Sequence, residues 1–420
     1  MARQLFRIVL ALIGMACCYY LFTLAGTAGA ARFFSATSVI QSSLGPADAA
    51  VKLAPNDPEG HYSRGIALTN LNRLNEAESE FERAVQLRPY YYYEWLDLGV
   101  TLERLGDSAG SIAAIRESIR LAPFFSQPRW QLGNLLYRQA QYDEAFTELR
   151  KGAESNSNLV QGMLDLAWAA ADGDVSKFEG FMQPSTVLGH LQVASFLANQ
   201  GKGEDAARQI AATGEPRDAY ELSILHQTIM ILISTRQFQA AYLAWLPGHR
   251  KVAGTGSPAQ LVNGNFAEPV VQNDPGFGWQ LSDDPAMTAS IDPSGPNGAR
   301  SLMLQFNGAS TPGSVLIHQL ILPTPNARYS LSFMARAEEL VTGGPPTIIV
   351  LDASEDAPKI LAQSSPITAP NSDWTRYQVD FSTAERTAAI RIGLQRMYCA
   401  QSPCPIFGRL WLSQFTLASR

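Results

Sequence analysis

The sequence predicts a multidomain protein with one N-terminal transmembrane helix, an all-α repeat solenoid and an all-β jelly-roll sandwich. Three observations lead to this prediction. The chain opens with a long uncharged apolar run, its next part repeats at a regular interval, and its last part alternates apolar and polar residues between turns. The length of 420 residues agrees with several domains, because single hydrophobic cores stop growing well below that size.

The apolar run extends from Ile8 to Ala31, which is 24 residues without a charge. As a helix it would be about 36 Å long, enough to cross a hydrocarbon core of about 30 Å. Arg3 and Arg7 precede it and Arg32 follows, so the positive-inside rule keeps the N-terminus in the cytoplasm and carries the rest across the membrane. We therefore expect residues 1–34 to form a cytoplasmic stub and a signal anchor.

A cleaved signal peptide is the alternative interpretation of this segment. Ala28-Gly29-Ala30 has the small-x-small form that signal peptidase accepts. The run is longer than the roughly 7–15 apolar residues of a usual signal peptide, which favours a retained anchor. Both interpretations place the rest of the chain outside the cytoplasm, membrane-bound in the first case and secreted or periplasmic in the second.

Net charge and the spacing of the histidines argue against two classes of ligand, nucleic acids and metal ions. A net charge of −6 and a pI near 5.5 argue against a nucleic-acid partner, and the five scattered histidines lack metal-ligand spacing. We therefore expect no cofactor and no metal.

Cys17 and Cys18 lie in the apolar run as small hydrophobic residues. Cys399 and Cys404 flank a short loop that a disulfide would close in an oxidising compartment.

A period of about 34 residues defines the middle of the chain, and three columns of residues share one register. They are Pro55, Pro89 and Pro123, then Gly65, Gly99 and Gly133, and then Leu68, Leu102 and Leu136. Small residues let two antiparallel helices approach closely, and a proline ends the second helix of each pair. Such pairs bury their apolar faces only by stacking on one another, which builds a solenoid with a concave face.

These columns resemble the tetratricopeptide-repeat family. The clear repeats cover residues 58–157, where Ser157 replaces the terminal proline. Helical periodicity continues over residues 158–248, where we expect degenerate repeats, so that the whole solenoid spans 35–248.

The resemblance implies a protein partner held by the concave face, which the first helix of each repeat lines. The candidate binding residues are Tyr62, Asn70, Tyr93, Arg104, Asn134, Tyr137 and Arg138. The arginine and asparagine side chains would hold carboxylates or backbone amides of a peptide. For each residue the alternative is an ordinary solvated position on a helix.

Composition changes abruptly after the helical region. Residues 249–258 are rich in Gly, Pro and Ser and predict a linker. Residues 259–420 carry short alternating strands between turn residues, which is typical of a two-sheet sandwich or jelly roll. The opening Leu261–Phe266 with Gly278-Trp279, and the closing Leu410–Leu417, resemble the galactose-binding-like fold of carbohydrate-binding modules.

That resemblance implies a polysaccharide as a second ligand. An aromatic side chain would stack on a sugar ring and polar side chains would read its hydroxyls, which nominates Trp279, Gln319, Arg391, Gln395, Arg396 and Tyr398. Core packing is the favoured interpretation for Trp374 and Trp411, which stand where this fold generally buries an aromatic side chain. Ser413 stands where the family usually has an Asp that supports a calcium ion, so calcium is doubtful.

The sequence contains no nucleophile-elbow, zinc-protease or phosphate-loop motif, and the neighbouring acids Asp283 and Asp284 would point to opposite faces of a strand. We therefore expect a protein that is not an enzyme. The leading hypothesis is a membrane-anchored extracytoplasmic scaffold, in a bacterial envelope or exopolysaccharide-assembly setting. The alternatives are a lectin-like protein displayed on a helical spacer, and an accessory subunit with two protein-binding domains.

Overall fold

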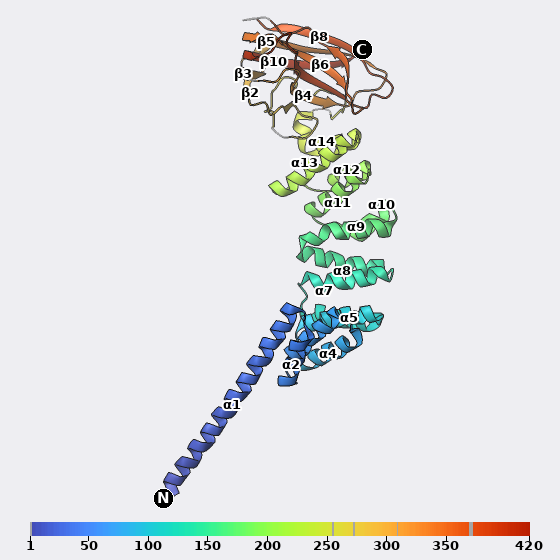
Figure 1. Ribbon diagram of the computed structural model, residues 1–420. Coiled ribbons are helices and arrows are strands. Elements are labelled where there is room, and N and C mark those ends of the chain that lie inside the picture. Colours follow the sequence, from blue (N-terminus) through green and yellow to red (C-terminus); the bar gives the residue numbers. More distant parts are fainter. Residues whose placement is uncertain (1, 254–255, 272–273, 309, 369–372) are drawn as a thin grey trace. The chain divides into compact units, whose positions relative to one another are not determined.

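A computed structural model describes residues 2–253, 256–271, 274–308, 310–368 and 373–420. Over these ranges, helices α1 to α14 come first in the chain and strands β1 to β10 follow (Figure 1). The chain divides into two compact units, Met1–Gln183 and Pro184–Arg420. The expected order of an apolar helix, a helical solenoid and an all-β sandwich is confirmed.

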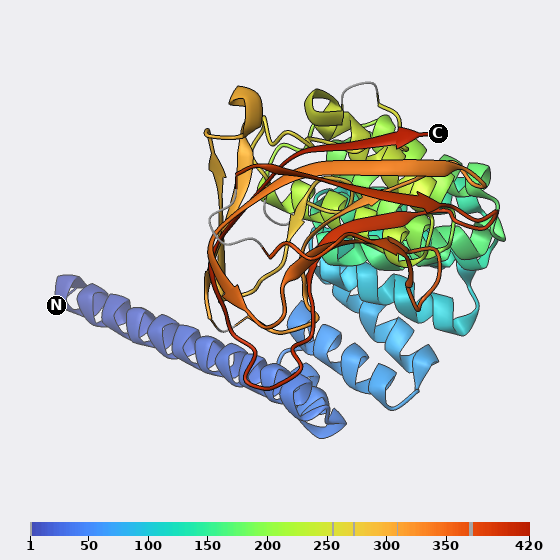
Figure 2. The same cartoon turned by 90° about the horizontal axis from the view of Figure 1, so that it is seen from above.

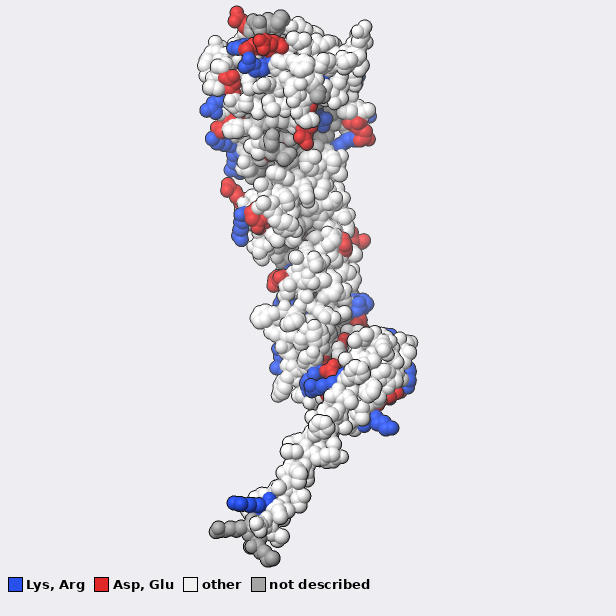
Figure 3. Space-filling view, turned by 60° about the vertical axis from the view of Figure 1, so that its left-hand side comes forward, with Lys and Arg blue, Asp and Glu red and all other residues white. Residues whose placement is uncertain are grey.

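Helix α1 (Ala2–Gln41) is long and apolar enough to cross a membrane. Its side chains from Gln4 to Gly29 are exposed, and Figure 3 shows this part as a rod whose surface is almost free of charged residues. The helix continues past the expected boundary at residue 34, because the first backbone break comes at Ser42, where φ is +49°. Its last turns pack on the first repeats through Ala31, Ser35 and Ser38.

The rest of the first unit consists of short helices in antiparallel pairs. They are α2 (Leu44–Leu53), α3 (Pro58–Asn70) with α4 (Leu74–Leu87), α5 (Tyr92–Leu105) with α6 (Ser108–Leu121), α7 (Ser126–Arg138) with α8 (Tyr142–Ser155), and α9 (Val160–Ala171) with α10 (Val175–Met182). A 3-10 turn, η1 (Ser157–Leu159), precedes α9.

The glycine column lies where the two helices of each pair come closest. A Cβ atom on Gly65 would lie 2.7 Å from Phe81 Cε1, and one on Gly99 would lie 2.5 Å from Ile115 Cγ1. These separations are shorter than any van der Waals contact, so only glycine fits. The regular spacing of these glycines therefore reports helix-to-helix packing directly.

Local capping explains several helix ends in this unit. Asp57 accepts a hydrogen bond from the Glu59 backbone N–H at 3.2 Å, and Pro58 occupies the first turn of α3. Asp107 caps α6 by accepting from the Gly110 N–H at 2.9 Å. Gly106 ends α5 with φ +89°, in the left-handed region where glycine is favoured.

The second unit begins with α11 (Val187–Asn199), α12 (Gly203–Ala211), α13 (Ala219–Ser234) and α14 (Phe238–Ala253). Helix α14 continues across Pro247 into the residues expected to form a linker, with a kink at His249, where φ is −124°. The α14 side chain Trp245 donates to Asp274 Oδ2 at 3.2 Å and lies 5.8 Å from the Phe277 ring. These contacts tie the last helices to the sandwich, and the second compact unit, Pro184–Arg420, contains both.

The sandwich consists of two antiparallel five-stranded sheets (Figure 2). One sheet has the order β1 (Gln280–Leu281), β4 (Val315–Ile321), β9 (Ile390–Arg396), β6 (Pro346–Asp352) and β7 (Lys359–Gln363). The other has the order β2 (Met287–Asp292), β3 (Ser301–Asn307), β10 (Ile406–Ser419), β5 (Arg328–Thr342) and β8 (Thr375–Ser382). A 3-10 turn, η2 (Pro296–Gly298), precedes β3.

The core between the sheets is aliphatic and aromatic. The Phe333 ring stacks on Tyr377 at 5.1 Å and on Phe415 at 5.2 Å. Trp411 lies on the other face of its strand, between the core residues Leu410 and Leu412. It is only 4% exposed, because guanidinium groups cover its ring. Trp411 is therefore buried on the outer face of the sheet, under these guanidinium groups, and not in the core between the sheets.

Candidate binding surfaces

The first helices of consecutive repeats are joined by a hydrogen bond on the predicted binding face. Tyr62 of α3 donates from its hydroxyl to Asp97 Oδ2 of α5 at 2.7 Å. Burial raises the pKa of Asp97 above its usual value, and the hydrogen bond from Tyr62 opposes that shift. Burial, reinforced by Asp97, also raises the pKa of Tyr62. This hydrogen bond therefore links the two repeats through a partly buried polar contact, and Tyr62 is only half exposed.

The two arginines of this face also reach across repeats. Arg104 Nη2 donates to Asn72 Oδ1 at 3.0 Å, and Arg138 forms an ion pair with Glu103 of the preceding repeat. Both arginines stay exposed on the surface. A guanidinium has five N–H donors, so each retains donors for a partner.

The other predicted residues differ in accessibility. Asn70 and Tyr93 are exposed, whereas Asn134 uses its amide to donate to the Trp130 carbonyl at 2.8 Å. Tyr137 is half buried, with its ring 5.4 Å from the Tyr142 ring. The residues that present side chains to solvent are Asn70, Tyr93, Arg104 and Arg138.

A row of aromatic side chains lies at the turns between repeats, and we name it the aromatic edge. It consists of Tyr90, Tyr91, Phe124 and Phe125, which are 82%, 39%, 85% and 52% exposed. Tyr92 connects its two halves, with a ring 4.8 Å from that of Phe125. The run of tyrosines is visible in the sequence, but both phenylalanines were missed there. The repeat register could have found them, because it puts Phe124 in the same column as Tyr90.

In the sandwich, three of the predicted sugar-binding residues are interior. Trp279 is 3% exposed and donates from its indole to the Asn263 carbonyl at 3.2 Å. Gln319 is fully buried, accepting from the Val262 N–H at 2.8 Å and donating to the Val262 carbonyl at 2.9 Å. Both hold the opening segment against the sheet, so the prediction that they meet a sugar at the surface is corrected to a role in the fold.

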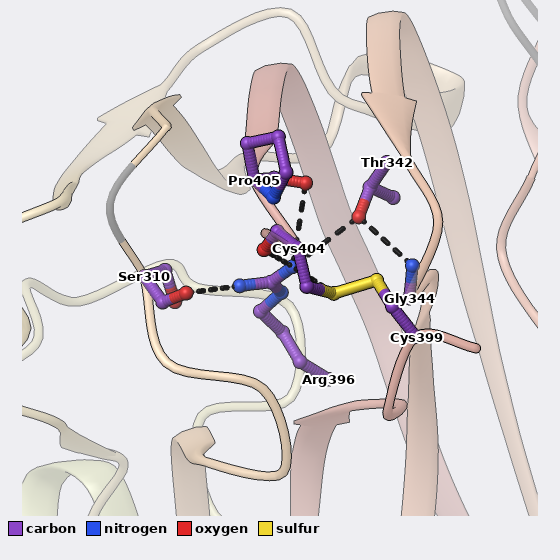
Figure 4. The surroundings of a disulfide bond; sticks show 7 residues. All are labelled: Ser310, Thr342, Gly344, Arg396, Cys399, Cys404 and Pro405. Carbon is purple, nitrogen blue, oxygen red and sulfur yellow. Dashed lines mark hydrogen bonds between the residues drawn. A yellow bond between two sulfur atoms is a disulfide. The ribbon is translucent and has the colours of Figure 1, made fainter. Parts of the chain in front are cut away.

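Arg396 is the third interior residue, and Figure 4 shows it beneath the loop closed by the Cys399–Cys404 disulfide. Its guanidinium donates to the Cys404 carbonyl at 2.9 Å and to the carbonyl of Ser310. Burial lowers the pKa of Arg396 from its usual value. The residue supports the loop from below and is not available to a ligand at the surface.

The remaining three candidates lie closer to solvent. Tyr398 is 78% exposed beside Gly313, where any added Cβ would lie 2.4 Å from its ring. Gln395 is half buried and donates to the Gly313 carbonyl at 2.8 Å. Arg391 is half buried next to His318, whose pKa is lowered to about 4 by burial and by the charge of Arg391. Among these candidates only Tyr398 offers a ring to solvent.

Metal-ligating side chains are scattered over the described part of the chain. No group of three or more His, Cys, Asp or Glu side chains that would hold a metal lies together within those ranges. Ser413, at the position considered for calcium support, is buried and donates to the Arg300 carbonyl at 2.6 Å.

A family model and several known proteins are similar in sequence to the helical part of the chain. Residues 58–91 match the family model described as "Tetratricopeptide repeat". Protein FlbA of Caulobacter vibrioides is 42% identical over 73 residues, which are 17% of this chain and 12% of that protein. DnaJ homolog subfamily C member 3 of Homo sapiens is 30% identical over 100 residues, which are 24% of this chain and 20% of that protein. The chain therefore spans a fifth or less of these curated relatives.

Solved structures resemble parts of the chain at low identity. "Crystal structure of MamA protein" covers 42% of this chain and 96% of its own, with 13% identity and a TM-score of 0.35. "CBM4 structure and function" covers 38% of this chain and 99% of its own, with 15% identity and a TM-score of 0.30. At such identities the likeness concerns the fold alone.

Proposed function

We propose that this chain, with its tetratricopeptide repeats and its carbohydrate-binding-module-like sandwich, is a membrane-anchored extracytoplasmic scaffold. In this proposal α1 spans the membrane with its N-terminus in the cytoplasm, and the solenoid holds a protein partner. The chain works by binding and not by catalysis. A setting in bacterial envelope or exopolysaccharide assembly fits the combination of domains.

The single observation that supports the scaffold role best is the aromatic edge beside the predicted binding face. Monomeric proteins seldom expose large aromatic side chains in a contiguous row unless a partner covers them. Tyr90 and Phe124 are both more than four-fifths exposed and lie at equivalent positions of adjacent repeats. Exposed Tyr93 and Arg104 lie on the first helix that follows the Tyr90 turn. Aromatic and arginine side chains are the residues that most often dominate protein-binding energies.

The membrane anchor is supported by the exposure and composition of α1. Apolar side chains along its first part, such as Leu12 and Phe22 at 56% and 78% exposure, have no protein contact to bury them. A hydrocarbon environment satisfies both these side chains and the helical backbone. The competing proposal is cleavage after Ala30. The intact mass of the mature protein distinguishes the two, since a retained anchor keeps the mass of the segment from Met1 to Ala30.

Partner capture from membranes tests the scaffold role. The full chain, solubilised from membranes in mild detergent after crosslinking, is expected to bring down one defined protein partner. Replacing Tyr90 and Phe124 by alanine should lower the recovered partner at least tenfold, because two central aromatic contacts are lost. Glu82→Ala, an exposed change on the second helix of a repeat, is the matched control and should leave recovery unchanged. Equal recovery with all three chains would contradict the proposal.

A second function, glycan binding by the sandwich, is favoured by the exposed ring of Tyr398 in the disulfide-closed loop. The lectin-like alternative gives the sandwich the main role, and a glycan array with the full chain tests it. Binding that is lost in Tyr398→Ala would support this alternative. An accessory subunit with two protein-binding domains would show no glycan binding and would lose a partner when either domain is changed.

A further inference from the structure

A polar cavity of about 570 Å³ lies at one edge of the sandwich, and its lining includes none of the predicted sugar-binding residues. Its walls come from the end of α14, from the segment 263–268, and from strands β5, β8 and β10. Side chains that line it include Arg376, Ser332, Thr416, Gln414, Asn265 and Lys251. We name it the Arg376 cavity.

The backbone around this cavity is held in costly conformations. A Cβ on Gly264 would lie 2.2 Å from the Phe415 carbonyl oxygen, and the Phe415 N–H donates to the Gly264 carbonyl at 2.8 Å. Asn263, Phe266 and Gln414 have φ values of +50°, +50° and +52°. Left-handed conformations cost non-glycine residues about 1–3 kcal/mol each, and they concentrate at functional sites. The fold thus keeps this wall in one defined shape at a cost in stability.

The cation in the cavity differs from three other arginines on or beside the same sheet. Arg336 and Arg409 form ion pairs with Glu338 at 3.0 and 2.6 Å, and Arg420 pairs with Asp380 at 2.9 Å. Arg376 Nη2 donates instead to the Ser332 hydroxyl at 3.2 Å. Within the described ranges no carboxylate pairs with it. Most of its five donors are therefore free to meet an anion.

Neighbouring groups add hydrogen-bonding capacity around that cation. The Ser332 hydroxyl is 2.8 Å from that of Thr416, which is exposed. Lys251 at the rim forms a 2.8 Å ion pair with Glu268, which also lines the cavity, so the unpaired positive charge there is that of Arg376. The aromatic residues of the wall, Phe333 and Phe415, are only 1% and 4% exposed, so they offer no ring for a sugar to stack on. Recognition here must come from charge and hydrogen bonds.

We propose that the Arg376 cavity binds a uronic acid unit of an anionic polysaccharide. The planar guanidinium of Arg376 would hold the sugar carboxylate through two parallel hydrogen bonds, a geometry that neutral sugars cannot provide. The hydroxyls of Ser332 and Thr416 and the side chain of Asn265 line the space for the sugar hydroxyls, while Gln414 Nε2 donates to the Pro296 carbonyl at 3.1 Å. This inference rests on the glycan-binding part of the proposed function and names its ligand class and its place.

Calorimetric titration of the full chain in detergent tests the inference. The probes are an oligomer of galacturonic acid, its carboxyl-reduced neutral counterpart, and a panel of other neutral oligosaccharides. The galacturonate oligomer should bind at least about tenfold more tightly than its neutral counterpart, and the difference should shrink with added salt. Arg376→Gln should remove that preference. Arg386→Gln, at another exposed arginine of the sandwich, should keep it.

Three results would overturn the inference, and they separate it from the proposed function. Unchanged galacturonate affinity in Arg376→Gln would place the acidic sugar elsewhere. Binding of neutral sugars alone would leave glycan binding intact and remove the anionic ligand. Binding of no saccharide by the unaltered chain would remove glycan binding together with this inference. Because Arg376 is exposed, a thermal melt of the variant should match that of the unaltered chain.

Discussion

Tyr62 of one repeat donates a 2.7 Å hydrogen bond to Asp97 of the next, on the face predicted to bind a protein. Asp97 is a half-buried carboxyl whose pKa is raised by burial, and Tyr62 is the group that partly compensates for its desolvation. A solenoid gains its stability from interfaces between neighbouring repeats. This hydrogen bond is therefore part of the framework that keeps the binding face in register.

Replacing Tyr62 by phenylalanine should destabilise this interface by about 1–3 kcal/mol, because a buried acceptor loses its partner. The loss should appear as faster amide hydrogen exchange in α3 and α5, measured by mass spectrometry on the full chain. Tyr90→Phe removes the hydroxyl of an 82% exposed ring and should leave exchange unchanged. Equal protection in the two variants would show that the Tyr62–Asp97 bond is energetically neutral.

The glycine column makes a second prediction about packing. Gly99→Ala should lower the stability of the repeats by about 1–3 kcal/mol, since its Cβ would lie 2.5 Å from Ile115 Cγ1. Gly180→Ala, in a helix where no atom lies within 4 Å of the added carbon, should instead be neutral or slightly stabilising. Thermal melts followed by circular dichroism at the helical band compare the two. Equal effects of the two changes would mean that the close approach of Ile115 does not govern this position.

The disulfide makes a prediction about the sandwich. Closing so short a loop should stabilise the folded state by about 2 kcal/mol. Replacing Cys399 and Cys404 together by serine should therefore lower the melting temperature of the sandwich and increase hydrogen exchange around Arg396. Alkylation of the unreduced chain, followed by intact mass, should modify Cys17 and Cys18 alone. Modification of all four cysteines would show that the loop is open in the protein as isolated.

Two histidines of the second unit give opposite dependences on pH. Burial and the charge of Arg391 lower the pKa of His318 to about 4, so the stability tied to its neutral form is complete above about pH 6.5 and is lost as pH falls toward 4. For His249, burial favours a lower pKa, but the hydrogen bond and charge of Asp274 outweigh it and raise the pKa. Its contribution is complete below about pH 6.5 and is lost as pH rises through the raised value.

Acidification from pH 7.5 to 5.0 should therefore cost the unaltered chain about 2 kcal/mol through His318. His318→Asn should show a smaller loss over this range, and His249→Asn a larger one, because the second change removes a group that favours the acidic side. Hydrogen exchange of the sandwich core at the two pH values measures both. The same response in both variants would contradict the assignment of these shifts.

The architecture followed from the sequence because its signals are local and periodic. Gly65 and Gly99 recur where helices touch, and alternation along β8 marks a strand with one buried face. Helix ends were harder to predict from the sequence. Helix α14, for example, continues across Pro247. Proline disfavours a helix interior, but contacts of Trp245 with Asp274 and Phe277 hold this segment in place. Such long-range contacts leave no local pattern.

The site residues were harder to predict because exposure depends on tertiary neighbours. Trp279 and Gln319 have the chemistry of sugar-binding residues, yet both pack against the 262–263 backbone. The Arg376 cavity joins residues far apart in the chain, so no sequence motif announced it. Phe124 was predictable in principle, because the repeat register aligns it with Tyr90.

Photocrosslinking in native membranes tests the central claim, that an anchored solenoid holds a protein partner, most directly. A photoreactive amino acid at Tyr93 of the predicted binding face should give one discrete crosslinked protein in the membrane fraction, and the same residue at Glu82 should give none. Mass spectrometry of the product identifies the partner. Absence of a product at Tyr93, or equal products at both positions, would contradict the account.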